Sequence, residues 1–170
     1  MMDFLSYLEH MKFSIWVLQS GSIWAYPTIL TVHTIGMGIV AGIAAVINLR
    51  LLGIAPKIPI RPLEKLYPLM WSGFWINAVT GTTLMIADAT TKLTNPDFGV
   101  KMVFVFSGVA LLVIMRKKIF QDPELDRKPV PANIKRLAWL SLACWTGAIT
   151  AGRLLAYLGP VSGVPGLSNQ

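Results

Sequence analysis

The chain has only two histidines, His10 and His33, and each carries ring nitrogens that can bind a metal ion. His33 lies in TVHTIGMG (residues 31–38), where small residues let a neighbouring helix or a flat cofactor approach the backbone closely. An imidazole facing such a gap can ligate haem iron, with a second histidine or a methionine on the opposite face. A two-histidine haem within one chain would therefore use His10 and His33. The alternatives are a quinone or metal site at His33, or a histidine that only hydrogen-bonds between packed helices.

Arg153 lies in AITAGRLLAY (residues 148–157), and the remaining nine residues of this segment are uncharged. A guanidinium stays charged, so within an apolar segment it needs an anionic partner or a route to water. The carboxylates of Asp88 and Glu9 are the expected partners, in that order, and Lys101 adds a second cation near them. Around a cofactor, Arg153 and Lys101 would neutralise haem propionates or a quinone oxygen. Otherwise an Arg153–Asp88 pair only sets helix register, or the arginine reaches outward to lipid phosphates.

The composition of the chain is typical of an integral membrane protein with one domain. Of its 170 residues, 54% are hydrophobic and 14% are charged, and its mean hydropathy is +0.60. Soluble domains carry about 25% charged residues. The net charge of +7 comes from residues that lie between apolar runs, so the pattern excludes a nucleic-acid-binding face. The single cysteine supports neither a disulfide nor a thiolate metal site, and the sequence contains none of the common hydrolase or nucleotide-binding motifs.

The arrangement of apolar runs predicts an all-α membrane protein, a four-helix transmembrane bundle preceded by an amphipathic helix. Residues 1–20 have apolar positions at helical spacing and are expected to lie in the membrane interface. Residues 21–158 form the transmembrane domain, since a bilayer core requires about 20 apolar residues per helix. Residues 159–170 are expected to form a flexible outer tail. The four predicted spans are residues 23–47, 67–87, 100–115 and 137–158.

The positions of the positive residues predict how the bundle is oriented. Eleven of the fifteen lysines and arginines fall in the first and third loops between the spans, and cytoplasmic loops carry such an excess. The opposite side holds only Lys12, Lys92 and Lys101. We therefore expect both termini and the second loop to face the periplasm, on the outer side of a bacterial inner membrane. The eleven residues are Arg50, Lys57, Arg61, Lys65, Arg116, Lys117, Lys118, Arg127, Lys128, Lys135 and Arg136.

With this orientation, the ionisable residues of the predicted helices converge on the outer half of the bundle. At a rise of about 1.5 Å per residue, His33 lies roughly 9 Å and Arg153 roughly 8 Å below the outer surface. Charges within a membrane are costly, so they usually face the bundle interior and mark a functional site. The expected outer cluster consists of Glu9, His10, His33, Asp88, Lys101 and Arg153.

Several strings carry a resemblance to a known family. WAYPTILTVHTIGMGIVAG, NLRLLGI, YPLMWSGFWINAVTGTTLMIADA, NPDFGVKM and RLAWLSLACWTGAITAGRLLAY resemble a family of small bacterial inner-membrane proteins with a domain of unknown function. The resemblance covers residues 4–158 and implies the four-helix plan, but no reaction. The architecture is also distantly similar to that of four-helix membrane b-type cytochromes, which hold more histidines. The positions to which the family resemblance points are His33, Asn48, Arg50, Gly73, Thr80, Gly81, Asn95, Pro96, Lys101, Gly152 and Arg153.

Two classes of function fit the sequence. In the first, the chain is a membrane electron-transfer subunit that holds a b-type haem or a quinone near the outer leaflet. In the second, it is a non-catalytic accessory or scaffold subunit of a larger membrane complex, and the polar cluster only stabilises the bundle. A small transporter for an anionic solute is a third hypothesis. So small a bundle offers little interior, and we therefore expect a homo-oligomer or a subunit of a larger complex, embedded in membrane lipid.

Overall fold

The computed structural model describes residues 2–121, 126 and 129–157, and this part of the chain is all-helical. The predicted outer tail, residues 159–170, lies outside the described residues, as do Arg127, Lys128 and the predicted end of the last span at Leu158. Within the described residues there are seven α-helices, one 3-10 helix and no strand. The helices are α1 (Met2–Glu9), α2 (Lys12–Gln19), α3 (Tyr26–Leu52), η1 (Arg61–Leu66), α4 (Tyr67–Ala87), α5 (Ala89–Thr94), α6 (Pro96–Ile119) and α7 (Ala132–Tyr157).

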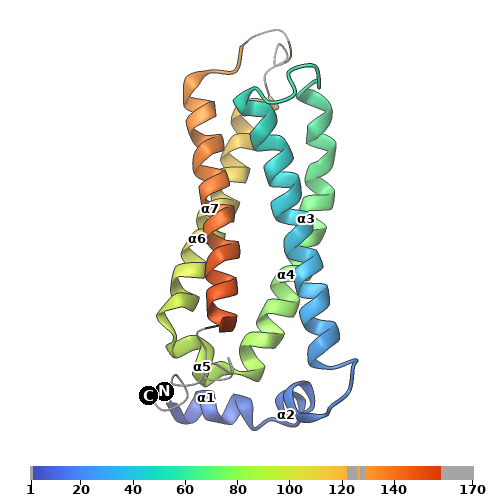
Figure 1. Ribbon diagram of the computed structural model, residues 1–170, viewed down its shortest axis with the longest axis vertical. Helices are drawn as coiled ribbons and strands as arrows, with labels where there is room; N and C mark the ends of the chain where they lie inside the picture. Colours follow the sequence, from blue (N-terminus) through green and yellow to red (C-terminus); the bar gives the residue numbers. More distant parts are fainter. Residues whose placement is uncertain (1, 122–125, 127–128, 158–170) are drawn as a thin grey trace.

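Four long helices form a bundle made of two antiparallel hairpins, as Figure 1 shows. The first hairpin is α3–α4 and the second is α6–α7, and α3 packs against α7 to join them. Within the described residues, α4 and α6 do not form a fourth seam of comparable closeness. The short helices α1, α2 and α5 lie together at one end of the bundle, at the bottom of the view (Figure 1). The loops with most of the positive residues lie at the other end.

Three of the long helices extend beyond the predicted spans, and local chemistry explains the ends of α3 and α6. Helix α7 begins at Ala132, five residues before the predicted start at residue 137. Helix α3 continues to Leu52, and Gly53 ends it in the left-handed conformation with φ 103°. Helix α6 begins at Pro96 because Asn95 caps it, its Oδ1 accepting a hydrogen bond of 2.9 Å from the Asp97 backbone N–H. At the other end, α6 runs on through three basic residues, which the negative end of a helix dipole favours.

The N-terminal segment differs from the single helix that was expected over residues 1–20. It consists of two helices, and the backbone is extended at Met11, with φ −64° and ψ 143°. The Ser14 hydroxyl bridges the break by donating a 2.6 Å hydrogen bond to the Leu8 carbonyl. Leu5, Ser14 and Val17 are buried against the bundle, where α1 contacts α4 and α5 and α2 contacts α4. The break lets both short helices lie across the end of the bundle (Figure 1).

Two of the long helices, α3 and α6, are long and apolar enough to cross a membrane, judged by length and composition. Large apolar side chains are exposed on the outside of the bundle, including on the other two long helices. Trp75 and Val79 on α4, Val103 and Phe106 on α6, and Trp139 on α7 each expose between 63% and 65% of their surface. Monomeric soluble proteins rarely expose apolar patches of this extent, which instead mark contact with a membrane or another protein.

The apolar core fills only one half of the bundle. It lies next to the loops rich in lysine and arginine, and the 3-10 helix packs against it through Leu63. Toward the end covered by α1, α2 and α5, the long helices contribute no residue to this core cluster. The buried interior of that half contains His33 together with Leu84, Ala87, Ala148 and Ala151, so it is less bulky and mixes a polar side chain with apolar ones. The core residues on the four long helices are Val40, Ala44, Ile47, Leu51, Tyr67, Met70, Leu112, Met115, Ile119, Ile134, Ala138 and Trp145.

Glycines set the distance between the helices of the first hairpin. A Cβ atom on Gly36 of α3 would lie 3.0 Å from the Gly73 carbonyl oxygen and 3.1 Å from the Asn77 backbone nitrogen. A Cβ atom on Gly73 of α4 would lie 2.7 Å from Cγ2 of Ile39. Neither position has room for a methyl group, so the two backbones meet directly. Small residues permit the same close approach between helices in membrane proteins.

The second hairpin packs glycine against aromatic rings. A Cβ atom on Gly108 of α6 would lie 3.0 Å from the Trp145 ring, and one on Gly147 of α7 would lie 2.9 Å from the Phe104 ring. Each helix therefore supplies one glycine and one aromatic ring to the other. Both hairpins are consequently held by contacts that a single added methyl group would disturb.

We predict that Gly73→Ala destabilises the protein while Gly42→Ala does not. A methyl group on Gly73 overlaps Ile39, and overpacking of this kind costs about 1–3 kcal/mol. A methyl group on Gly42 meets no atom within 4 Å, and alanine favours a helix more than glycine does. Thermal unfolding of each variant in detergent tests this expectation. Equal melting temperatures for the two variants would contradict the close approach of α3 and α4.

Candidate functional site

The His33 side chain lies in the seam between α3 and α4 and is only 8% exposed. Its Nδ1 atom is 3.0 Å from the Thr80 hydroxyl oxygen. That hydroxyl lies 2.6 Å from the Ile76 carbonyl, to which it donates its proton, so it accepts a hydrogen bond from His33. This hydrogen-bond logic assigns the proton of the neutral ring to Nδ1 and leaves a lone pair on Nε2. A histidine in this state can bind a metal or accept a hydrogen bond at Nε2.

Helix α4 is shaped around His33 at two further positions. The Asn77 side-chain amide donates a 2.8 Å hydrogen bond to the His33 backbone carbonyl. A Cβ atom on Gly81 would lie only 2.9 Å from Cε1 of the imidazole, so the absence of a side chain there gives the ring its space. Asn77 had not been singled out in the sequence. An amide in an otherwise apolar span, one helical turn before Thr80, was the available signal.

Lys101 brings a charge to the interior from the second hairpin. Its side chain lies along α7, and a Cβ atom on Gly152 would be 3.6 Å from Cε and 3.8 Å from Nζ. Lys101 is the sixth residue of α6 and His33 the eighth of α3, so both lie about 8–10 Å from the helix ends next to α1, α2 and α5. The two ion pairs in the described part of the chain join Lys92 to Asp88 and Arg116 to Glu64, so neither involves Lys101. A partly buried cation of this kind favours an anionic or electron-rich partner.

Each of the four long helices thus contributes one position at a similar depth in the bundle, with His33 next to Thr80 in one hairpin and Lys101 next to Gly152 in the other. We use the name His33–Lys101 site for His33 on α3, Thr80 on α4, Lys101 on α6 and Gly152 on α7. The site presents an uncharged nitrogen lone pair from one hairpin and a positive hydrogen-bond donor from the other. It lies in the half of the bundle nearer to α1, α2 and α5, about 10 Å along α3 from Tyr26. Its chemistry suits a ligand with two separated oxygen atoms, one for each group. It also suits a metal-containing cofactor with carboxylate groups, whose metal would meet His33 and whose carboxylate would meet Lys101.

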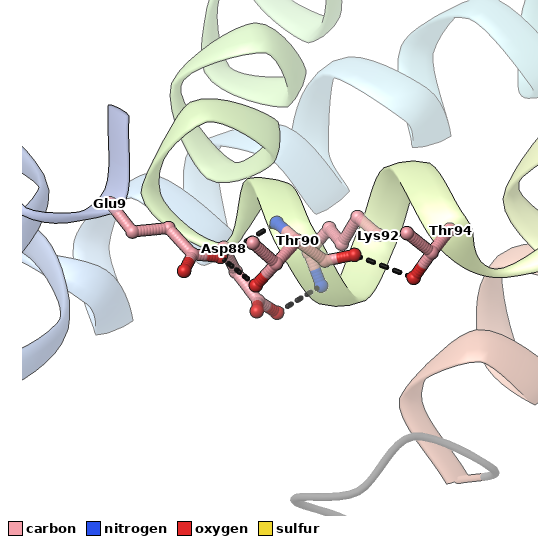
Figure 2. Close-up of polar contacts among 5 residues, drawn as sticks. All are labelled: Glu9, Asp88, Thr90, Lys92 and Thr94. Carbon is pink, nitrogen blue, oxygen red and sulfur yellow. Dashed lines mark hydrogen bonds and ion pairs between the residues drawn. The ribbon is translucent and has the colours of Figure 1, made fainter. Parts of the chain in front are cut away.

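The structure does not bring Arg153 and Asp88 together as expected. The Arg153 side chain is exposed, whereas the Asp88 carboxylate lies 3.1 Å from the Lys92 ammonium group, one helical turn away (Figure 2). An i,i+4 pair of this kind forms within one short segment and needs no partner from α7. The exposed position of Arg153 matches the alternative in which the guanidinium reaches outward. We therefore leave Arg153 out of the His33–Lys101 site.

Glu9 has a different partner from the one expected. Figure 2 shows its carboxylate reaching from α1 to the start of α5, where Oε1 accepts hydrogen bonds from the Thr90 backbone N–H and hydroxyl. These distances are 2.7 Å and 2.5 Å. The first N–H groups of a helix have no partner within the helix, and a carboxylate at that end is favoured by the helix dipole. Glu9 thus caps α5 from another helix and attaches the N-terminal segment to the bundle.

His10 and His33 have different contact partners. It is exposed at the end of α1, and its Nδ1 atom donates a 2.7 Å hydrogen bond to the Ser6 carbonyl. The imidazole of His33 instead contacts Thr80 and Gly81 on α4. The structure does not place the two histidines as a pair around one haem. The described residues also contain no group of three or more histidine, cysteine or acidic side chains that could hold a metal ion.

Other positions marked by the family resemblance make structural contacts. The Asn48 amide donates a 2.9 Å hydrogen bond to the Ser141 hydroxyl, and both residues are fully buried between α3 and α7. Arg50 donates hydrogen bonds to the carbonyls of Pro56 and Ile58 and so orders the first loop. Comparison of the chain with protein-family models, curated proteins and solved structures yields no match. Support for a function therefore comes from the geometry of these side chains.

We predict that Glu9→Ala loosens the N-terminal helices while Asp3→Ala does not. Both variants remove one carboxylate from α1, but only Glu9 caps α5, and loss of a cap costs about 1 kcal/mol. Backbone amides of α1 and α2 should exchange their hydrogens about fivefold faster in Glu9→Ala. Hydrogen exchange followed by mass spectrometry measures this rate. If the two variants exchange alike, the cap does not hold these helices in place.

Proposed function

We propose that the chain is an integral membrane protein in which α3, α4, α6 and α7 all cross the bilayer. The 21 residues of α4 give it a length of about 30 Å, which matches the hydrocarbon core. The exposed Trp75 and Val79 on α4, and Trp139 on α7, would then face lipid. Polar side chains that bond to one another across helices, such as His33 with Thr80 and Asn48 with Ser141, support the same arrangement.

We also propose that the end carrying α1, α2 and α5 faces the periplasm. The first and third loops, which hold most of the positive residues, share the opposite end of the bundle (Figure 1). This asymmetry is typical of cytoplasmic loops. Exposed aromatic residues on the N-terminal segment, such as Phe4, Tyr7 and Trp16, suit a position in the membrane interface. The resemblance to small bacterial inner-membrane proteins supports this location.

For function, we propose that the chain is an electron-transfer subunit that binds a quinone at the His33–Lys101 site. The observation that supports this proposal is that a buried histidine on one hairpin, with its Nδ1 bonded to Thr80, and a partly buried lysine on the other lie at similar depth in the bundle. A quinone or quinol has two oxygen atoms on opposite edges of its ring. Nε2 of His33 would accept a hydrogen bond from a quinol hydroxyl, and Lys101 would donate one to the second oxygen. Ligand sites commonly combine an apolar lining with a few such polar groups.

A b-type haem is the second candidate, because the Thr80 hydrogen bond orients His33 as second-shell partners orient metal-binding histidines. Lys101 would then pair with a propionate. His10 does not supply the opposite ligand within the chain, so this site would offer haem iron one histidine. Quinone is preferred because it needs no second ligand. Two other functions remain: an accessory subunit that binds neither ligand, and a transporter in which anions pass Lys101. The experiments below distinguish them from a quinone or haem protein.

The orientation can be tested with single cysteines in a Cys144→Ser background. Thr94→Cys, at the end of α5, should react from outside intact cells with a membrane-impermeant thiol reagent. Lys57→Cys, in the loop after α3, should react only after the membrane is opened. Both residues are exposed, so accessibility within the protein does not limit either reaction. The reverse labelling pattern would overturn the proposed topology.

We predict that purified wild-type protein retains quinone, and that His33→Ala and Lys101→Met each retain at least tenfold less. A hydrogen bond to the charged Lys101 contributes about 1.5–3 kcal/mol, which corresponds to about tenfold or more, and His33→Ala removes both a neutral hydrogen bond of about 0.5–1.5 kcal/mol and the packing of the imidazole. Organic extraction followed by chromatography measures the retained quinone. The control variants His10→Ala and Lys12→Met remove a histidine and a lysine outside the site and should retain the wild-type amount.

The absorption spectrum of the same preparations separates the remaining functions. A Soret band that disappears in His33→Ala would identify haem instead of quinone. Wild-type protein that carries neither ligand, after production with ample haem and quinone, would leave the scaffold role. An anion flux into vesicles that Lys101→Met abolishes would identify a transporter.

A further inference from the structure

A cavity of about 300 Å³ lies between the beginning of α4 and the end of α6, at the end of the bundle opposite the His33–Lys101 site. Its apolar part is formed by Tyr67, Trp71 and Phe120. The ring of Tyr67 meets that of Phe120 edge to face, with centroids 5.6 Å apart, and the Tyr67 hydroxyl lies 3.4 Å from the Leu112 carbonyl. These contacts fix the floor of the cavity. Its volume is at the lower end of the range for small-molecule sites.

The rim of this cavity is positively charged. Arg116 and Lys117 line it, and Lys118 follows them in the last turn of α6. The Arg116 guanidinium lies 5.4 Å from the centroid of the Tyr67 ring, a cation–π contact that holds it over the aromatic floor. Glu64 also lies on the rim and is the one carboxylate that pairs with Arg116 among the described residues.

The pair between Glu64 and Arg116 leaves the guanidinium able to bind a further anion. Nε of Arg116 lies 3.7 Å from the carboxylate oxygen, and both side chains are nearly half exposed. Exposed pairs at such a distance contribute little. Within the described residues, neither Nη nitrogen of Arg116 donates a hydrogen bond. Both can therefore still donate hydrogen bonds to a phosphate group in bidentate geometry.

We propose that this cavity binds the phosphate headgroup of an anionic phospholipid from the cytoplasmic leaflet. The site combines cations that suit a phosphate with an aromatic floor that continues into the apolar spans. The cavity is too small for a whole phospholipid, so the acyl chains would lie along α4 and α6, the two helices that do not form a close seam. Basic pockets between membrane helices on the cytoplasmic side recognise headgroups in this way. The proposal rests on the membrane insertion and orientation proposed above, and not on the quinone.

The test measures lipid binding to the detergent-solubilised protein by native mass spectrometry and by thermal shift. The probes are dimyristoyl phosphatidylglycerol, dimyristoyl phosphatidylcholine, glycerol phosphate and inorganic phosphate. We expect tight binding of phosphatidylglycerol only. Equal binding of both lipids would reject recognition of a negative headgroup. Equal binding of phosphatidylglycerol and glycerol phosphate would mean that the site takes a soluble phosphate and not a lipid.

Three variants are expected to weaken phosphatidylglycerol binding, to strengthen it and to leave it unchanged, respectively. Arg116→Gln with Lys117→Gln should weaken phosphatidylglycerol binding by at least tenfold, since each positive charge contributes about fivefold. Glu64→Gln removes the competing carboxylate and should strengthen binding. Lys57→Gln with Arg61→Gln removes the same charge from the same end of the protein, outside the cavity, and should leave binding close to wild type.

The pattern of these variants decides the proposal. Weaker binding in Glu64→Gln, or equal losses in both double variants, would overturn a specific site and indicate a general attraction to positive loops. A chain that is stable and monodisperse without detergent would overturn membrane insertion itself. In that case the lipid proposal would fail for a different and recognisable reason.

Discussion

The direct contact of the α3 and α4 backbones at Gly36 and Gly73 is the constraint on which the arrangement around His33 depends. With no side chain at either position, the two helices approach until the backbone of Gly36 meets that of Gly73 and the Ile39 side chain meets Gly73. His33 is then close enough for Thr80 to accept its Nδ1 hydrogen and for Asn77 to reach its carbonyl. Wider spacing by a single methyl group would lengthen both hydrogen bonds. The state of the imidazole is therefore a result of helix packing.

The sequence was sufficient to predict the helical plan but not its short elements. Hydropathy located the four long helices, and residues 67–87 correspond to α4. The break at Met11 escaped notice because apolar residues keep their helical spacing on both sides of it, so periodicity carries no sign of the extended residue. Helix α5 lies in the second loop between the predicted spans, where no helix was expected. Asn95 and Pro96 form a recognisable start signal for α6, and the shorter span was predicted by weighing hydropathy above that signal.

The depth of each site residue along its helix was predictable from the sequence, but the direction in which its side chain points was not. Arg153 was placed near the outer end of α7, yet its apolar neighbours on all sides left its direction open, and the side chain is exposed. The Asp88–Lys92 pair could have been found from its i,i+4 spacing. The contact of His33 with Thr80 depends on how two helices face each other. Local sequence holds no information on that, and the resemblance indicated both residues without indicating that they touch.

The cap that Glu9 places on α5 has a consequence for the order in which the chain can assemble. Glu9 and Thr90 are 81 residues apart, so the acceptor is synthesised long before its donor exists. During translation, α1 and α2 emerge first and have no docking surface until the α3–α4 hairpin has followed them. The attached position of the N-terminal segment is thus reached only by a chain whose first hairpin is complete. A nascent protein arrested before α5 would leave these aromatic helices open to chaperones and proteases.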